Sequence, residues 1–244
     1  MRPIWPGAGK LEWAKIRHSL CADAQISRGC RADLPHGASI KEKRVSLPAG
    51  PFRFIALDVE TANADAASLC QIGLACVRHD GAIEVFSTLI DPRQPFAPFN
   101  VALHGIGPAK VRGAPSFPEV LARIAPLLAP QIVIQHSPFD RGAIHRACHA
   151  HDLPEPGWHW ADSVQIARRA WPEFSGNGGH GLAHLKQALG LEFTHHDAGE
   201  DAKAAAMVVL RAEAQTGLRL EELIAPARRA RPRRVAAALV RPRT

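Results

Sequence analysis

The stretch FIALDVET at residues 54–61 decides the fold, because an apolar run from Phe54 to Leu57 passes directly into acidic residues. A short apolar run of this kind, following Pro and Gly, is typical of a buried β-strand. Side chains alternate between the two faces of a strand, so Asp58 and Glu60 are expected on one face at its end. Such a carboxylate pair would suit Mg²⁺ or Mn²⁺, which prefer oxygen ligands. Alone it is weak evidence, since any exposed strand end can carry one.

Outward from this stretch, the sequence alternates between strand-like and helix-like segments. An Asp-Gly pair at 80–81 predicts a hairpin between two β-rich runs. Three consecutive strands followed by alternating helices and strands indicate an α/β fold, with a mixed five-stranded sheet flanked by helices. The expected strands are 54–57, 70–77, 83–90, 132–134 and a run ending at 160–162. The expected helices are 117–128, 139–151, a helix capped by Asp162 or Ser163, 181–189 and 198–214.

Two further segments place acidic residues where strands end or helices begin. HSPFD at 136–140 follows a buried strand and opens a helix, so Asp140 lies in the first helical turn. The ends of strands in α/β sheets are the usual location of a site, although a carboxylate there also simply favours the helix dipole. HHDAGEDA at 195–202 runs into the last long helix. His196 and Asp201 are five residues apart across a turn and the first helical turn, so their side chains can face one pocket. His195 is an adjacent alternative to His196 for the same role.

Each segment is modest, but the ordered set DVET, HSPFD and HHDAGEDA resembles the DEDDh 3′→5′ exonucleases, the family of the proofreading epsilon subunit of bacterial DNA polymerase III. The resemblance covers roughly residues 53–216 and implies a ribonuclease-H-like fold. The chain departs from the family pattern at Ala62–Ala64, where a Gly is frequent, and at Ser137-Pro138, where Asn-Ala is common. Neither departure changes an expected metal ligand.

The resemblance also implies roles for individual residues. Asp58, Glu60, Asp140 and Asp201 would hold two Mg²⁺ or Mn²⁺ ions, and His196 would be the general base. Thr61, His104 and Phe139 correspond to positions near the terminal nucleotide and are expected substrate contacts. The implied reaction is hydrolysis from the 3′ end of DNA, releasing nucleoside 5′-monophosphates in replication proofreading or repair. The expected partners are DNA with a single-stranded 3′ end and a DNA polymerase.

Charge divides the 244 residues into three parts. The first 50 residues carry nine Lys or Arg against four acids, and residues 219–244 carry eight against two, whereas the middle is mildly acidic. We expect a basic extension and linker at 1–51, an exonuclease domain at 52–218 and a basic tail at 219–244. The basic ends would suit a polyanion, or would simply keep the protein in solution.

Composition excludes several classes of protein. No run of 18 apolar residues predicts a membrane span, and the N-terminus does not read as a secretory signal. Five scattered cysteines without a CxxC pair predict reduced thiols in the cytoplasm.

Three other functions remain open from the sequence. The fold could serve a non-catalytic nucleic-acid-binding or polymerase-associated module, or an exoribonuclease that trims RNA. A weaker alternative is a zinc-dependent hydrolase that uses the pair His180 and His184, or the His cluster at 145–151.

Overall fold

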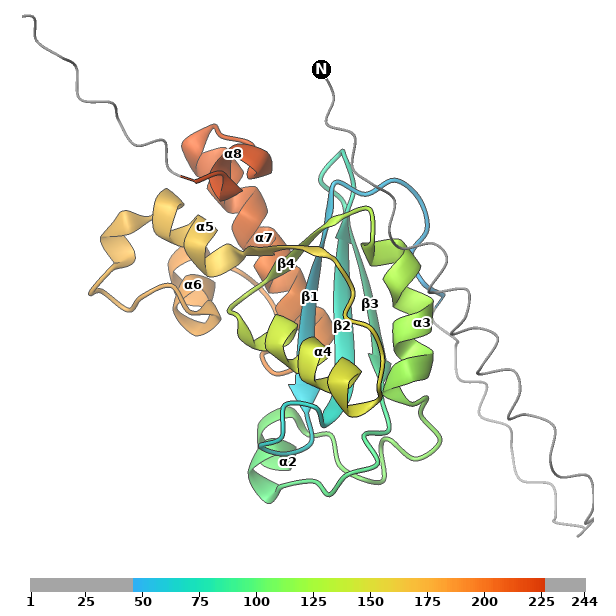
Figure 1. Ribbon diagram of the computed structural model, residues 1–244. Helices are drawn as coiled ribbons and strands as arrows, with labels where there is room; N and C mark the ends of the chain where they lie inside the picture. Colours follow the sequence, from blue (N-terminus) through green and yellow to red (C-terminus); the bar gives the residue numbers. More distant parts are fainter. Residues whose placement is uncertain (1–45, 227–244) are drawn as a thin grey trace, which may run out of the picture.

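The computed structural model describes residues 46–226, and the basic segments at 1–45 and 227–244 lie outside the described residues. A five-stranded sheet in the order β3-β2-β1-β4-β5 forms its centre, with helices on both faces (Figure 1). The first three strands form an antiparallel meander, and β4 and β5 add in parallel to β1. The strands are β1 (Phe54–Thr61), β2 (Leu69–Val77), β3 (Ile83–Leu89), β4 (Ile132–Gln135) and β5 (His159–Asp162).

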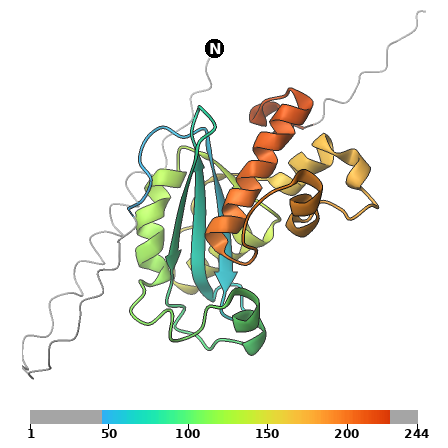
Figure 2. The same ribbon diagram turned by 180° about the vertical axis from the view of Figure 1, so that it is seen from behind.

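The helices fill the connections and the two faces of the sheet. On one face lie α3 and α4, and on the other α7 crosses β1 and β2 with α5 and α6 beside it (Figures 1 and 2). The helices are α2 (Pro98–His104), α3 (Phe117–Leu128), α4 (Phe139–Ala150), α5 (Ser163–Ala170), α6 (Leu182–Leu189), α7 (Ala198–Thr216) and α8 (Leu220–Ile224), with a short 3₁₀ turn, η2 (Pro172–Phe174).

Strand β1 is central, so both of its faces are covered. Phe54 and Ala56 pack on the α7 side, whereas Ile55 and Leu57 pack against α3 and α4. All four are fully buried, which explains why the strand appears in the sequence as a continuous apolar run. The alternation continues to the end of β1. Its even-numbered residues therefore face α7, and its odd-numbered residues face α3 and α4.

Close packing between β2 and the start of α7 depends on glycine. A Cβ at Gly73 would lie 2.1 Å from the carbonyl carbon and oxygen of Ala198, so no other residue fits. A Cβ at Gly199 would lie 3.1 Å from side-chain atoms of Val85 and Ser87 on β3. The Ala-rich face of α7 therefore lies close against the sheet, and this contact fixes where its first turn stands relative to the end of β1.

The observed elements agree with the expected ones, with three additions. Helix α3 begins and ends as predicted at Phe117 and Leu128, and the mixed five-stranded sheet flanked by helices is confirmed. The additions are α2, η2 and α8. Leu220 and Leu223 of α8 are 1% and 2% exposed, so packed structure continues beyond 218, where the sequence placed the start of the tail.

No helix in the described part of the chain is long and apolar enough to cross a membrane.

Candidate active site

The acids of β1 lie at its carboxyl end, on the face that α7 covers. Asp58 and Glu60 follow Phe54 and Ala56 in the alternation and are half-buried. In Figure 1 the arrowhead of β1 points toward α2, which places this end of the strand at the lower edge of the sheet. The sequence prediction that the two carboxylates share a face is therefore consistent with the observed strand.

Asp201 reaches the same place from the first turn of α7. It is only 4% exposed. The start of the helix is fixed by Asp197, whose side chain accepts hydrogen bonds from the backbone N–H groups of Gly199 (3.0 Å) and Glu200 (3.2 Å). Carboxylate oxygens of Asp58, Glu60 and Asp201 all lie within 4.8 Å of one another. Three acids from two elements thus converge on one point.

Gln71 of β2 ties this turn to the sheet. Its Nε2 donates to Asp197 Oδ2 at 3.1 Å, and its Oε1 accepts from the backbone N–H of Ala198 at 3.2 Å. Both ends of the side-chain amide are therefore used to hold the first turn of α7. No sequence motif singled out Gln71, because its partners are 126 and 127 residues away.

Asp140 joins the cluster from the opposite face of the sheet. It stands in the first turn of α4, is 3% exposed, and accepts a hydrogen bond from the backbone N–H of Val59 at 3.2 Å. Strand β4 ends at Gln135, so the carboxylate takes a β1 donor that has no partner strand there. This bond places Asp140 between the two acids of β1 along the backbone.

Burial raises the pKa of all four carboxylates, and neighbouring acidic charges add to this for Asp58, Glu60 and Asp140. Burial, followed by the charges of Asp140, Asp201 and Glu60, raises the pKa of Asp58 well above its ordinary value. Burial, followed by the charges of Asp201, Asp140 and Asp197, raises the pKa of Glu60 to about 7. Burial also raises the pKa of Asp140 to about 7, although the Val59 N–H bond opposes this, and it raises the pKa of Asp201 against the effect of the nearby histidines.

A cluster of buried acids with raised pKa values is the environment in which a divalent cation binds, because the cation removes the mutual repulsion. Every donor in the acid cluster is a carboxylate oxygen, the ligand that Mg²⁺ and Mn²⁺ prefer. The residues present therefore fit a pair of such ions.

Two histidines stand beside Asp201. His195 Nδ1 lies 2.9 Å from Asp201 Oδ1, and the backbone N–H of His196 donates to Asp201 Oδ2 at 2.8 Å. The two imidazole rings are stacked, with centroids 4.5 Å apart and planes inclined by 10°. His196 was the expected base. The structure also brings the side chain of its rival, His195, into contact with the acid.

The expected substrate residues have different surroundings. The Thr61 carbonyl accepts hydrogen bonds from Asn100 Nδ2 at 2.9 Å and from His104 Nε2 at 3.1 Å. His104 Nδ1 in turn accepts from the backbone N–H of Ile106 at 3.0 Å, so both of its ring nitrogens are engaged within the protein. This arrangement gives His104 a structural task and does not favour a hydrogen bond to substrate.

Phe139 immediately precedes Asp140 and is 50% exposed, as a contact to a nucleotide requires. It lines a hollow of about 370 Å³ between the β1–β2 loop and α4, with Ala64–Ala66 on one side and Gly142 and Arg146 on the other.

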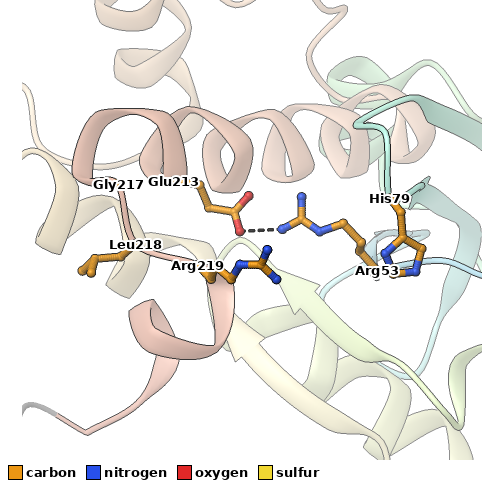
Figure 3. Close-up of a pocket in the computed structure, with 6 residues that line it drawn as sticks. All are labelled: Arg53, His79, Glu213, Gly217, Leu218 and Arg219. Carbon is orange, nitrogen blue, oxygen red and sulfur yellow. Dashed lines mark hydrogen bonds and ion pairs between the residues drawn. The ribbon is translucent and has the colours of Figure 1, made fainter.

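Figure 3 shows a second hollow, whose volume is about 360 Å³. It is formed at the beginning of β1 and the end of α7, the opposite ends of the elements that carry Asp58 and Asp201. There Arg53 Nη2 donates to Glu213 Oε1 at 2.5 Å. The remaining lining residues are His79, Gly217, Leu218 and Arg219. This hollow is separate from the acid cluster.

The zinc alternative finds no support in the placement of its histidines. Within residues 46–226, the groups of His, Cys, Asp and Glu close enough to hold a metal ion are Asp58-Glu60-Asp201 and His195-His196-Asp201. His180 instead contacts the carbonyl oxygen of Trp171 through its Nε2 at 2.9 Å.

The carboxylates gather at the strand ends of a mixed sheet, in a group that could hold a metal ion. Comparison with known proteins identifies the family. The chain belongs to the exonuclease family, whose model matches residues 55–209. The fold is ribonuclease-H-like, and the expected resemblance to DEDDh exonucleases of bacterial DNA polymerase III is confirmed, with PolC-type DNA polymerase III proteins as the relatives found.

Curated relatives include PolC-type DNA polymerase III proteins. The protein from Streptococcus mutans is 29% identical over 201 residues, covering 81% of this chain and 13% of the relative. The protein from Streptococcus thermophilus is 30% identical over 155 residues, covering 62% of this chain and 10% of the relative. The chain thus matches about a tenth of the length of these relatives.

Solved structures share the fold at lower identity. Exonuclease X in complex with 5′ overhanging duplex DNA has a TM-score of 0.56 at 21% identity, covering 70% of this chain and 97% of that one. The nuclease domain of 3′hExo, a DEDDh family member bound to rAMP, has a TM-score of 0.56 at 17% identity, covering 67% and 92%. E. coli Exonuclease I in complex with a dA13 oligonucleotide has a TM-score of 0.57 at 20% identity, and the match covers 67% of this chain and 41% of that one.

Proposed function

We propose that this protein is a 3′→5′ exonuclease that hydrolyses phosphodiester bonds from the 3′ end of DNA and releases nucleoside 5′-monophosphates. One observation carries the proposal. Asp58, Glu60 and Asp201 bring carboxylate oxygens within 4.8 Å of one another, with Asp140 bonded to the same strand and two imidazoles at Asp201. A structural module of this fold would have no need to keep four mutually repelling acids together.

In this proposal the four acids hold two divalent ions, Mg²⁺ or Mn²⁺, at the end of β1. When bound, such ions lower the pKa of water and stabilise charge on phosphate oxygens. Asp140 contributes from the α4 side and Asp201 from the α7 side. His196 accepts the proton of the attacking water, because a neutral imidazole has one ring nitrogen with a free lone pair.

The terminal nucleotide would lie against Thr61 and Phe139. Thr61 is held in place by Asn100 and His104, so the end of β1 is rigid where it meets substrate. The exposed ring of Phe139 could stack on a base, an interaction that tolerates any sequence. Phe99 on α2 is 75% exposed and offers a second aromatic ring near the same end of β1.

DNA is the substrate that the comparisons favour. Exonuclease X and Exonuclease I were solved with DNA, and the curated relatives are DNA polymerases. We therefore include a single-stranded 3′ end, a DNA polymerase partner and a place in proofreading or repair in the proposal. A cytoplasmic location is also part of it, and it fits the free cysteines Cys70, Cys76 and Cys148.

RNA is the second candidate substrate, because the 3′hExo domain was solved with rAMP. The discriminating experiment uses matched single-stranded DNA and RNA and mismatched duplex DNA, each labelled at either end, with Mg²⁺ or Mn²⁺. We expect immediate release of a 3′ label as a mononucleotide, a descending ladder from a 5′ label, and faster degradation of DNA.

The control for this experiment is Asp58→Asn, which should bind DNA but release no product. Release from the 5′ end would contradict the proposed direction, and faster loss of RNA would transfer the proposal to an exoribonuclease. Tight binding without hydrolysis by the wild-type protein would support the non-catalytic alternative.

A further inference from the structure

His195 and His196 are neighbours in the chain, yet their side chains lie on the same side. In an extended segment consecutive side chains point to opposite sides. Here His196 has a backbone φ of 66°, in the left-handed region that few residues other than glycine adopt. The turn brings the two rings into a parallel stack, 4.5 Å between centroids.

Phe193 also contacts the ring of His195. Its ring meets that of His195 edge-on, with centroids 5.4 Å apart and planes inclined by 69°. The imidazole of His195 therefore contacts two neighbouring rings, and both contacts restrain its orientation.

Two buried polar atoms in this arrangement lack a hydrogen-bond partner among the described residues. They are His195 Nδ1 and Asp201 Oδ1, which face each other at 2.9 Å as an ion pair and have no other polar partner in the described part of the chain. Unsatisfied buried polar atoms are uncommon and call for an explanation, such as an ion. A ring nitrogen of His196 completes the group, because all three ligand atoms lie within 4.8 Å of one another.

We propose that His195, His196 and Asp201 form a second metal site, which takes a transition-metal ion such as Zn²⁺ and differs from the all-oxygen cluster beside it. Imidazole nitrogen suits zinc, whereas carboxylate oxygen suits Mg²⁺ and Mn²⁺. Three protein ligands with one open position are a common zinc arrangement. The two sites share Asp201, so the contents of one affect the other.

Zinc at this site would inhibit the nuclease, and this part of the inference rests on the proposed function. A ring nitrogen of His196 that coordinates zinc has no lone pair left to accept a proton from water. The bound zinc would also draw Asp201 away from the acids of β1. The site would therefore act as a zinc-dependent off-switch.

The binding half is tested with zinc alone, by calorimetric titration of the full chain in excess Mg²⁺. The variants are His195→Ala and His195→Phe, the second of which keeps an aromatic ring against His196 and Phe193. His149→Ala, an exposed histidine on α4, is the matched control. We expect wild type and control to bind one Zn²⁺, and both His195 variants to bind it roughly 10- to 100-fold more weakly. Equal zinc affinity in wild type and both His195 variants would overturn the site.

The inhibitory half is tested on a labelled oligonucleotide in Mg²⁺, with each variant compared with its own zinc-free rate. Stoichiometric zinc should inhibit wild type and His149→Ala, and should have little effect on His195→Phe. Equal inhibition of all three would overturn the switch. If the wild type hydrolyses nothing, the proposed nuclease function fails, while the zinc titration still decides the site.

Discussion

The acids and the histidines of the candidate site are held by different kinds of structure. The acids stand on β1, α4 and α7, elements whose buried faces form the core. The histidines stand in the segment between α6 and α7, where a left-handed turn at His196 and ring stacking place them. The position of the acids thus follows from packing across the whole domain, whereas that of the histidines follows from a few local contacts.

Because of this difference, substitutions in the site should affect catalytic activity and folding stability to different degrees. The acids repel one another in a protein without bound cations, so they weaken the fold that positions them. Exchanging an acid should therefore remove activity without unfolding the protein. Disturbing the packing beneath an acid should lower both the activity and the stability. Exchanging a histidine should affect activity and leave the core unchanged.

The largest effect is expected from Asp58→Asn. The change keeps the side-chain volume and removes one carboxylate charge from the cluster, so we expect a loss in kcat on the order of 10³-fold or more. The fold should be retained, and without added metal the melting temperature should rise because one repelling charge is gone. Exonuclease assays and thermal melts check both. Near-wild-type activity in the metal-supplied variant would contradict the assignment of the acids.

His196→Ala should have the next largest effect, with a loss of roughly 10²- to 10⁴-fold if the imidazole is the general base. His195→Ala is the control and should lose far less, since its ring contacts Asp201 without being assigned the proton transfer. Both should melt like the wild type. The measurement is kcat against pH for each variant. An equal loss in both would leave the base unassigned.

Gly73→Ala tests the packing that places Asp201. The new methyl group would meet the Ala198 backbone at 2.1 Å, so the start of α7 must move. We expect about 2 kcal/mol of lost stability from this overpacking. A displacement of about 1 Å at Asp201 would lower the rate roughly 100-fold. Gly157→Ala is the control, because nothing lies within 4 Å of its added carbon. Unchanged activity in Gly73→Ala would show that α7 can shift without moving the site.

Much of the fold could be predicted from the sequence, because its main elements carry strong periodic signals. The stripe at 117–128 and the apolar run before Asp58 reflect burial on one face of a helix or on both faces of a strand. Helix α2 was missed because it has no buried side chain and so no stripe, and α8 because it has five residues. The role of α2 in holding Thr61 through Asn100 is a tertiary contact across 39 residues that no local pattern shows.

The acids of the site were predicted from the resemblance to the DEDDh exonucleases, and the structure brings them close to one another. Their supporting contacts could not be predicted. The Val59 N–H bond to Asp140 requires β4 to end before β1 does, and the role of Gln71 requires the packing of α7 on β2. The shared side of His195 and His196 depends on one backbone angle, which the sequence does not specify.

The smallest effect is a pH dependence of stability that the acids impose in the absence of metal. Burial and mutual repulsion raise the pKa of Glu60 and Asp140 to about 7 in the folded protein, whereas in the unfolded chain they titrate near their ordinary values. Between those values the folded state holds more protons than the unfolded state, so stability falls as pH rises through this window.

We therefore expect the melting temperature of the chelator-treated protein to fall by roughly 3–8 °C between pH 5 and pH 7.5, a range that allows for solvent screening of the half-buried Glu60. Mg²⁺ or Mn²⁺ should remove most of the decline, because a bound cation stabilises the ionised form. In Asp58→Asn the decline should be shallower, since one of the repelling charges is missing. A melting temperature that rises with pH in the metal-free protein would mean that the acids do not face one another. The core packing would then not place the acids together, and they would not differ in this way from the histidines, which local contacts place.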